Sequence, residues 1–161
     1  MTFSAGQTLT ADALNTAFAA VTTLFAVSSA DQNVGPSNTT LQNVTDLAVS
    51  VAAGAVYEFR LDLQYSTNTT ADIKIGFTFP VGLTMDYALL AFNTSETWVT
   101  SRGSQTTVLS LGGTGTVVVL AGTVTVGSTA GTLQLQAAQA TSTAVATTVE
   151  QGSLLVLKRL S

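Results

Sequence analysis

The clearest pattern in the chain is a strict alternation of apolar and polar side chains over residues 55–66, AVYEFRLDLQYS. The odd positions are Tyr57, Phe59, Leu61, Leu63 and Tyr65, and the even positions are Glu58, Arg60, Asp62, Gln64 and Ser66. Successive side chains of a β-strand point to opposite faces of its sheet. The pattern therefore predicts one strand with an aromatic and aliphatic core face and a polar, charged second face.

Short strand-like segments separated by turn residues continue to the end of the chain. They are predicted at residues 40–42, 47–52, 56–66, 72–79, 85–92, 97–101, 106–111, 116–126, 132–138, 144–149 and 153–160. Turn signals such as Pro80-Val81-Gly82 recur at the spacing typical of an antiparallel sandwich. The pattern has no alternation of strands with helices, so a parallel sheet is not expected.

Two predicted strands, residues 116–126 and 154–157, are apolar on both faces. In an antiparallel sandwich, one of those faces has no core of its own chain to pack on. We expect a neighbouring subunit to cover it, through Val118, Leu155 and Leu157, with burial under a loop or helix of the same chain as the alternative. Gly122 interrupts the first of these strands, which predicts a bulge there.

Helical periodicity is confined to residues 8–25, TLTADALNTAFAAVTTLF. Thr10 is a candidate N-cap, and Asp12 suits the positive end of the helix dipole. The apolar stripe consists of Leu14, Phe18, Val21 and Phe25. Because a helix of this length is marginal alone, the stripe must be buried. We expect it to dock on a particle or a neighbouring subunit, and packing on its own domain is the alternative.

These patterns predict an all-β antiparallel sandwich preceded by a short N-terminal amphipathic helix. Residues 1–30 form an N-terminal anchoring segment, residues 31–38 (DQNVGPSN) a linker, and residues 39–161 the sandwich. No apolar run approaches the ~18 residues of a transmembrane helix. Residues 17–27 resemble the apolar part of a signal peptide, but no Lys or Arg precedes them, and a signal peptide is not expected.

Composition favours a subunit of a large assembly. Charged residues are 9% of the 161, against about 25% in a typical soluble domain, so we expect much of the surface to be buried against copies or other proteins. The net charge is −4. The cations are Arg60, Lys74, Arg102, Lys158 and Arg159. They form no basic stripe, so neither nucleic acid nor an anionic membrane is an expected partner.

Candidate chemistry is sparse. The chain has no Cys and no His, which removes disulfides, thiolate ligands and the commonest general base and metal ligand. No phosphate-binding loop or dinucleotide fingerprint occurs in the sequence. We therefore expect no catalytic residue, no cofactor and no metal site.

Two groups of residues are candidate contacts. Glu58, Arg60 and Asp62 share one strand face. Two carboxylates so placed suit acid–base catalysis, but Arg60 between them holds both ionised, which favours a structural ion ladder. Trp98 is a possible receptor or sugar contact, and a core or interface anchor is the alternative.

Two stretches carry a family resemblance. The opening FSAGQTLTADALN, with Phe3 and Gly6, resembles the start of short virion proteins of tailed bacteriophages. The remainder resembles their single β-domain, above all TTLQNVTDLAVSVAAGAVYEFRLDLQYS and GTLQLQAAQATSTAVATTVEQGSLLVLKRL. Residues 55–59 and 152–155 also resemble two strands of the tumour-necrosis-factor and complement-head jelly roll, although Ala55-Val56 stands where that pattern has Gly.

The resemblance implies a jelly-roll sandwich and a non-enzymatic, homotrimeric protein of the virion surface, assembled in the host cytoplasm. It implies that Glu58, Arg60 and Asp62 face a neighbouring subunit and that the N-terminal segment docks on other virion proteins. Capsid decoration or a short head fibre is the leading role. The alternative is a tail-fibre or minor tail protein that binds a host-surface receptor or glycan. A glycan-cleaving enzyme is disfavoured, because the sequence lacks His, Cys and a convergent pair of acids.

Overall fold

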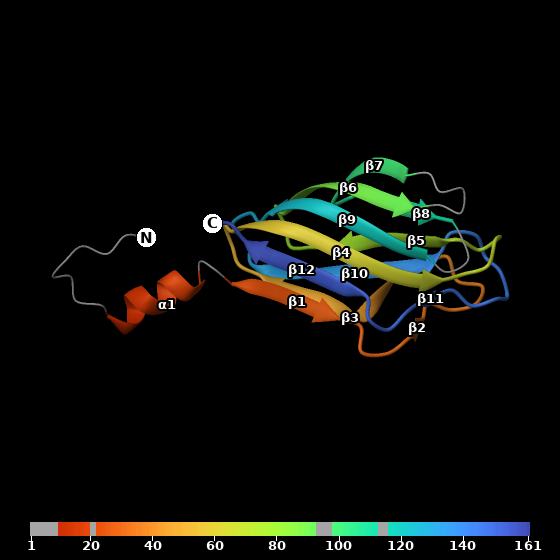
Figure 1. Cartoon of the computed structure of the whole chain (residues 1–161), viewed down its shortest axis with the longest axis horizontal. Helices are drawn as coiled ribbons and strands as arrows, with labels where there is room; N and C mark the ends of the chain where they lie inside the picture. Colours follow the sequence, from red (N-terminus) through yellow and green to blue (C-terminus); the bar gives the residue numbers. More distant parts are fainter. Residues whose placement is uncertain (1–9, 20–21, 93–97, 113–115) are drawn as a thin grey trace.

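The computed structural model describes residues 10–19, 22–92, 98–112 and 116–161. These residues form two antiparallel sheets packed face to face, preceded by one short helix (Figure 1). The elements are α1 (Ala11–Ala19), β1 (Thr23–Val27), β2 (Gln32–Asn33), β3 (Gln42–Val51), β4 (Val56–Ser66), β5 (Ile73–Thr78), β6 (Thr84–Phe92), β7 (Trp98–Ser104), β8 (Leu109–Leu111), β9 (Thr116–Thr125), β10 (Gly131–Gln139), β11 (Thr148–Val149) and β12 (Leu154–Arg159). The predicted all-β sandwich is confirmed.

The strands pair as one long nested hairpin. The first strand pairs with the last, the second with the eleventh, and so on inward to β6 with β7. The hairpin is then rolled up, so that β12 also pairs with β4, β9 with β6, and β10 with β5. The larger sheet has the order β1-β12-β4-β9-β6-β7 and the smaller one β3-β10-β5-β8. A hairpin rolled into two sheets in this way is a jelly roll.

Strand β4 builds the core as its alternation predicts. Its odd-numbered side chains are buried, and its even-numbered side chains are exposed or half-buried. Phe59 meets Phe77 of the smaller sheet edge to face, with ring centroids 5.8 Å apart. Burying each such side chain contributes about 1.5–3 kcal/mol, so this single strand anchors both layers.

The start of the sandwich differs from the prediction. The helix ends at Ala19, and Thr23–Val27 is a strand on the edge of the larger sheet, where Phe25 lies opposite Val156. The apolar spacing fits a helix that continues to Phe25, whereas the β-branched and aromatic side chains of these five residues favour a strand. Pairing with β12 decides between them. The sandwich therefore begins at Thr23 instead of residue 39, and the predicted linker contains β2.

Other local predictions have mixed outcomes. Thr10 caps α1, since its Oγ1 accepts a hydrogen bond of 3.1 Å from the backbone N–H of Ala13.

The predicted bulge at Gly122 is wrong, because the register of β9 with both neighbouring strands is continuous there. Gly122 has a different role, because a Cβ at this position would collide with the backbone of Asp86 and Tyr87. The glycine is therefore required for the close approach of β6 to β9.

Candidate functional site

The outer face of the larger sheet carries a polar strip along its middle. The strip is made by the even-numbered residues of β4, which are exposed or half-buried. Within it, Arg60 Nε donates to both carboxylate oxygens of Asp62, at 3.0 Å each. This hydrogen bond, and then the charge of Asp62, raise the pKa of Arg60. Glu58 lies opposite Lys158 of β12. Of the three residues of the predicted ladder, Arg60 and Asp62 thus form an ion pair, and Glu58 is a cross-strand neighbour of Lys158.

Apolar side chains flank the strip on both sides. On one side, Phe25 lies opposite Val156, and Val27 lies opposite Leu154. We call these four residues the outer apolar patch. Phe25 is 69% exposed and Val27 45%, and Leu154 and Val156 are half-buried. On the other side, Val117 of β9 is 56% exposed. The outer face of the sheet thus carries exposed large apolar side chains on both sides of its polar strip.

Three residues predicted at a subunit interface lie elsewhere. Val118, Leu155 and Leu157 are 1%, 0% and 0% exposed and belong to the core of their own chain. The prediction for these three side chains is therefore wrong. A strand that is apolar on both faces gives no signal for which set of alternate residues points inward. The other set, on β9 and β12, makes the outer face.

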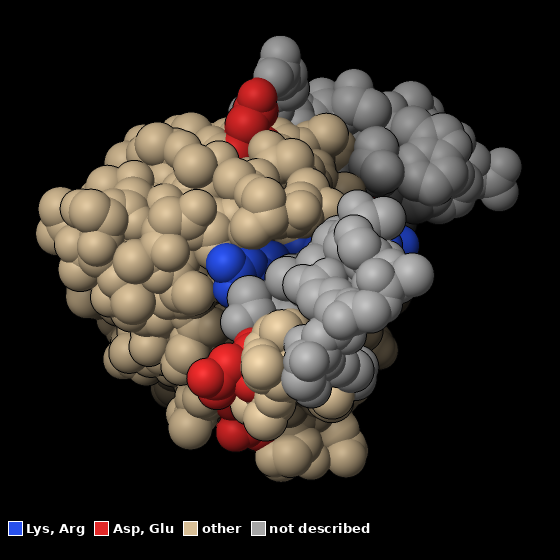
Figure 2. Space-filling model, turned by 90° about the vertical axis from the view of Figure 1, so that its left-hand side faces the viewer, with Lys and Arg blue, Asp and Glu red and all other residues tan. Residues whose placement is uncertain are grey.

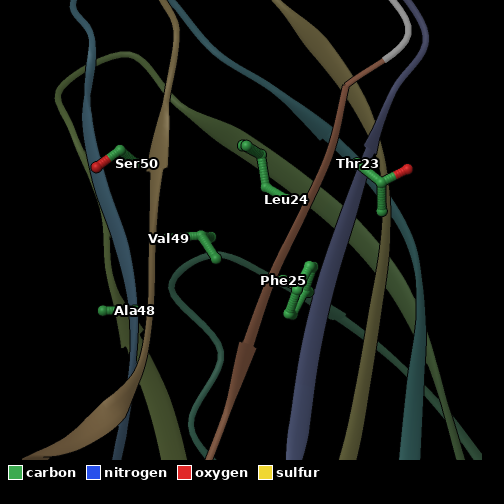
Figure 3. A pocket seen from close by; sticks show the side chains of 6 residues that line it. All are labelled: Thr23, Leu24, Phe25, Ala48, Val49 and Ser50. Carbon is green, nitrogen blue, oxygen red and sulfur yellow. The ribbon is translucent and has the colours of Figure 1, made fainter.

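A groove opens between the edges of the two sheets, where β1 and β3 are the terminal strands. A hollow of about 350 Å³ is lined by Thr23, Leu24, Phe25, Ala48, Val49 and Ser50. A second hollow of about 200 Å³ shares Leu24 and Ser50 and adds Thr22, Ala52, Tyr57 and Arg159. We call the two together the edge groove. Figure 3 shows Leu24 and Val49 pointing toward each other across it. The sequence reasoning missed this groove because it missed β1.

The predicted helix stripe is divided by the structure. Leu14 is on α1 and is 37% exposed, whereas Phe25 is on β1. The side chain of Phe18, and Val21 as a whole, lie outside the described residues, so their docking role stays a prediction. Trp98 begins β7 opposite Phe92. Its side chain is also outside the described residues, and the receptor contact stays a prediction.

The described part of the chain has no candidate metal site. No three of its His, Cys, Asp and Glu residues are grouped so as to hold a metal ion. None of its helices is long and apolar enough to cross a membrane. Figure 2 shows the end of the molecule that bears α1, where uncharged residues predominate and a small basic group lies between acidic ones.

Two polar groups stand apart from the outer face. The hydroxyl of Tyr87 is buried, and it has no hydrogen-bond partner among the described residues. Burial raises its pKa. Asp46 of β3 accepts hydrogen bonds from the side chain and the backbone N–H of Ser29, and these lower the pKa of its carboxyl. The Asp46 contact ties the chain that follows β1 to β3.

Comparison with known proteins gives little. No protein-family model matches the chain, and no curated protein is significantly similar to it. Among solved structures, it is similar to the tripod (BppUct-A-L) from the baseplate of bacteriophage Tuc2009, with a TM-score of 0.35 and 13% identity over 99% of this chain and 72% of that one. A likeness at that level transfers nothing to this chain.

Proposed function

We propose that this chain is a non-enzymatic structural subunit of a tailed-bacteriophage virion, which assembles as a homotrimer through the outer face of its larger sheet. The sequence resemblance supplies the virion context. The outer face supplies the means of assembly, and capsid decoration or a short head fibre is the role we favour.

One observation carries the proposal: an aromatic side chain, Phe25, is 69% exposed on the edge strand of the larger sheet. It is not isolated, because Val27, Leu154 and Val156 adjoin it in register. Water contact with such a patch is unfavourable by about 25 cal/mol for each Å². A second copy of the same face, or an adjoining face of a copy, removes that cost.

The polar strip gives this interface its specificity. Arg60 is 60% exposed and Asp62 25%, and an ion pair so placed adds at most about 1 kcal/mol to the stability of one chain. Alternating charges between two apolar regions instead penalise a shifted or inverted contact. The strip therefore sets the register of the subunits, and the apolar regions supply the affinity.

The N-terminal segment is the proposed attachment to the particle. The sandwich begins at Thr23, so residues 1–22 precede the fold. The helix in this segment has an exposed Leu14 and one charged residue, Asp12. Such a segment suits contact with other proteins better than contact with water.

The alternative role is a tail-fibre or minor tail protein that binds a host-surface receptor or glycan, with Trp98 as the contact. Copy number distinguishes the two roles. Quantitative mass spectrometry of purified particles is expected to find this chain at a copy number comparable to that of the shell protein. A handful of copies for each particle would instead identify a tail component.

Light scattering of the purified full chain tests assembly. The expected mass is that of three 16.4 kDa chains. The variant Phe25→Lys places a charge in the outer apolar patch and is expected to shift the protein toward monomer. The matched control Val81→Lys alters another exposed apolar residue, 82% exposed, in the turn between β5 and β6. A monomeric wild-type chain would refute the proposal.

A further inference from the structure

We infer that the subunits of the proposed homotrimer meet head to tail, with the outer apolar patch of one copy packed on the outer face of β9 and β6 in the next copy. The inference rests on the proposed function and names the two surfaces that its contact joins. The second surface consists of outward-pointing residues that are exposed or half-buried, Val117, Val119 and Ala121 of β9 and Ala88 of β6. We call these four residues the β9–β6 patch.

The two patches lie on one sheet face but cannot meet within one chain. The strand order β1-β12-β4-β9-β6 puts three strand spacings, about 14 Å, between β1 and β9. The polar strip of β4 lies between the patches. A ring of three copies joins two unlike surfaces of each copy. Each patch can therefore contact a different neighbour, as such a ring requires.

The placement of the patches also gives the direction of the symmetry axis. They are separated across the strands and not along them, so a rotation that brings one patch onto the other patch of the next copy turns about an axis along the strands. Such a rotation leaves every residue at its own height along the strands. The register of the sheet therefore predicts which residues of two copies meet.

At the height of Phe25, a large side chain meets small ones. The successive strand pairings put Phe25 level with Ala121 of β9, and Ala121 is paired with Ala88 of β6. Phe25 is exposed, whereas each alanine presents only a methyl group. The aromatic ring of one copy can therefore approach the sheet of the next copy closely, between the levels of Val119 and Thr123.

One level further toward the end of β1, apolar side chains meet. Val27 shares its height with Leu154 of β12 and, across β4, with Val119 of β9. Val27 is exposed, and the other two are half-buried. Contact between these side chains would remove apolar surface of both copies from water, a gain of about 25 cal/mol for each Å².

On the other side of Phe25, opposite charges share a level. Lys158 of β12 is exposed and forms no ion pair among the described residues. It is level with Asp86 of β6. A neighbour turned end for end about the level of Phe25 would instead place Lys158 against Val119, and Val27 against Asp86. Charge and burial therefore both favour the level, head-to-tail contact.

Because the chain contains no Cys, cysteine crosslinking tests the contact directly. Full-length Val27→Cys, carrying a size tag, is co-assembled with untagged Val119→Cys. The mixture is treated with a bifunctional maleimide that spans about 10 Å, the spacing of packed sheets. The expected product is a covalent pair of one tagged and one untagged chain, at a yield about tenfold above that of the control, because contact raises the local concentration.

The matched control replaces Val119→Cys by Thr125→Cys. Thr125 is exposed on the same face of the same strand but lies about 20 Å further along it. Equal yields for the two partners of Val27→Cys would overturn the level register. An excess of pairs between two tagged chains would overturn the head-to-tail contact, because it would show that the Val27 positions of two copies meet.

Light scattering of the same samples separates these outcomes from a failure of the proposed function. A trimer that does not yield the pair of Val27→Cys with Val119→Cys overturns this contact and leaves the trimer standing. A monomer refutes the trimer itself.

Charge reversal provides a second arm. Lys158→Asp in the Val27→Cys chain, or Asp86→Lys in the Val119→Cys chain, is expected to lower the yield of the mixed pair about two- to fivefold, the effect of one exposed ion pair. Combining both reversals is expected to restore the yield. Failure of the combined reversal to restore it would overturn the proposed register.

Discussion

Phe25 and Val156 face each other across the β1–β12 pair, and Phe25 remains 69% exposed there. Leu155, which immediately precedes Val156 on β12, is fully buried. Adjacent residues of one strand thus belong to different surfaces, the outer apolar patch and the core. Their substitutions should affect different properties of the protein.

Replacing Val156 by Lys is expected to weaken self-association at least tenfold and to leave the fold intact. The added charge lies in the outer apolar patch, where association would remove it from water. Sedimentation velocity over a range of concentrations measures association, and thermal unfolding checks the fold. An unchanged association constant would contradict a subunit contact at this patch.

Replacing Leu155 by Ala is expected to lower the free energy of unfolding by about 2–5 kcal/mol, because the change leaves a cavity in the core. Denaturant unfolding measures it, with the exposed residue Thr123→Ala as a control that should stay within ~0.5 kcal/mol. A Leu155→Ala protein that is as stable as the wild type but fails to associate would contradict the core assignment and place Leu155 in the subunit interface.

Replacing Gly122 by Ala is expected to cost about 1–3 kcal/mol of stability, because the new methyl group would overlap the backbone of Asp86 in β6. The loss should be greater than for Gly54→Ala, where a Cβ meets no atom and only the positive φ of +71° opposes the change. Chemical denaturation of both variants tests the ranking, and a harmless Gly122→Ala would refute the close approach.

The Ser29–Asp46 contact predicts a pH effect with a definite sign. Hydrogen bonds from Ser29 lower the pKa of Asp46 in the folded protein. Their contribution to stability is therefore fully present above the ordinary Asp pKa of about 3.9 and is lost as the pH falls through the lowered folded value.

The variant Ser29→Ala removes the side-chain donor, which is the larger cause of the shift, and leaves the backbone N–H. The pKa of Asp46, followed by NMR titration of its carboxyl carbon, is expected to rise part of the way to the ordinary value. The stability difference between Ser29→Ala and the wild type should shrink in acid. A pKa of Asp46 that does not move in this variant would show that the contact is not made in solution.

Truncation separates the anchor from the fold. Deleting residues 1–22 is expected to leave the sandwich folded and to abolish attachment to particles, measured by co-sedimentation. Deleting residues 1–30 also removes β1, which pairs with β12 along its whole length, and is expected to destabilise the sandwich. If the protein lacking residues 1–22 still co-sediments with particles, the anchor lies elsewhere.

The sequence by itself determined the all-β class, most of the strands and the core face of β4. Alternation with a period of two is a local property, and each of Tyr57, Phe59 and Leu61 could be assigned from its immediate neighbours. The N-cap at Thr10 was likewise readable, because capping depends on residues within one helical turn.

Only the tertiary structure decided which face of β9 and β12 is outside and where the sandwich begins. When a strand is apolar on both faces, its sequence does not show which alternate residues point inward. The burial of Leu155 on β12 and the exposure of Val117 on β9 therefore depend on how these strands pair and pack. Residues 23–27 became a strand because β12, from the other end of the chain, lies beside them. The edge groove follows from the same event, since it exists only where β1 comes to lie beside β3.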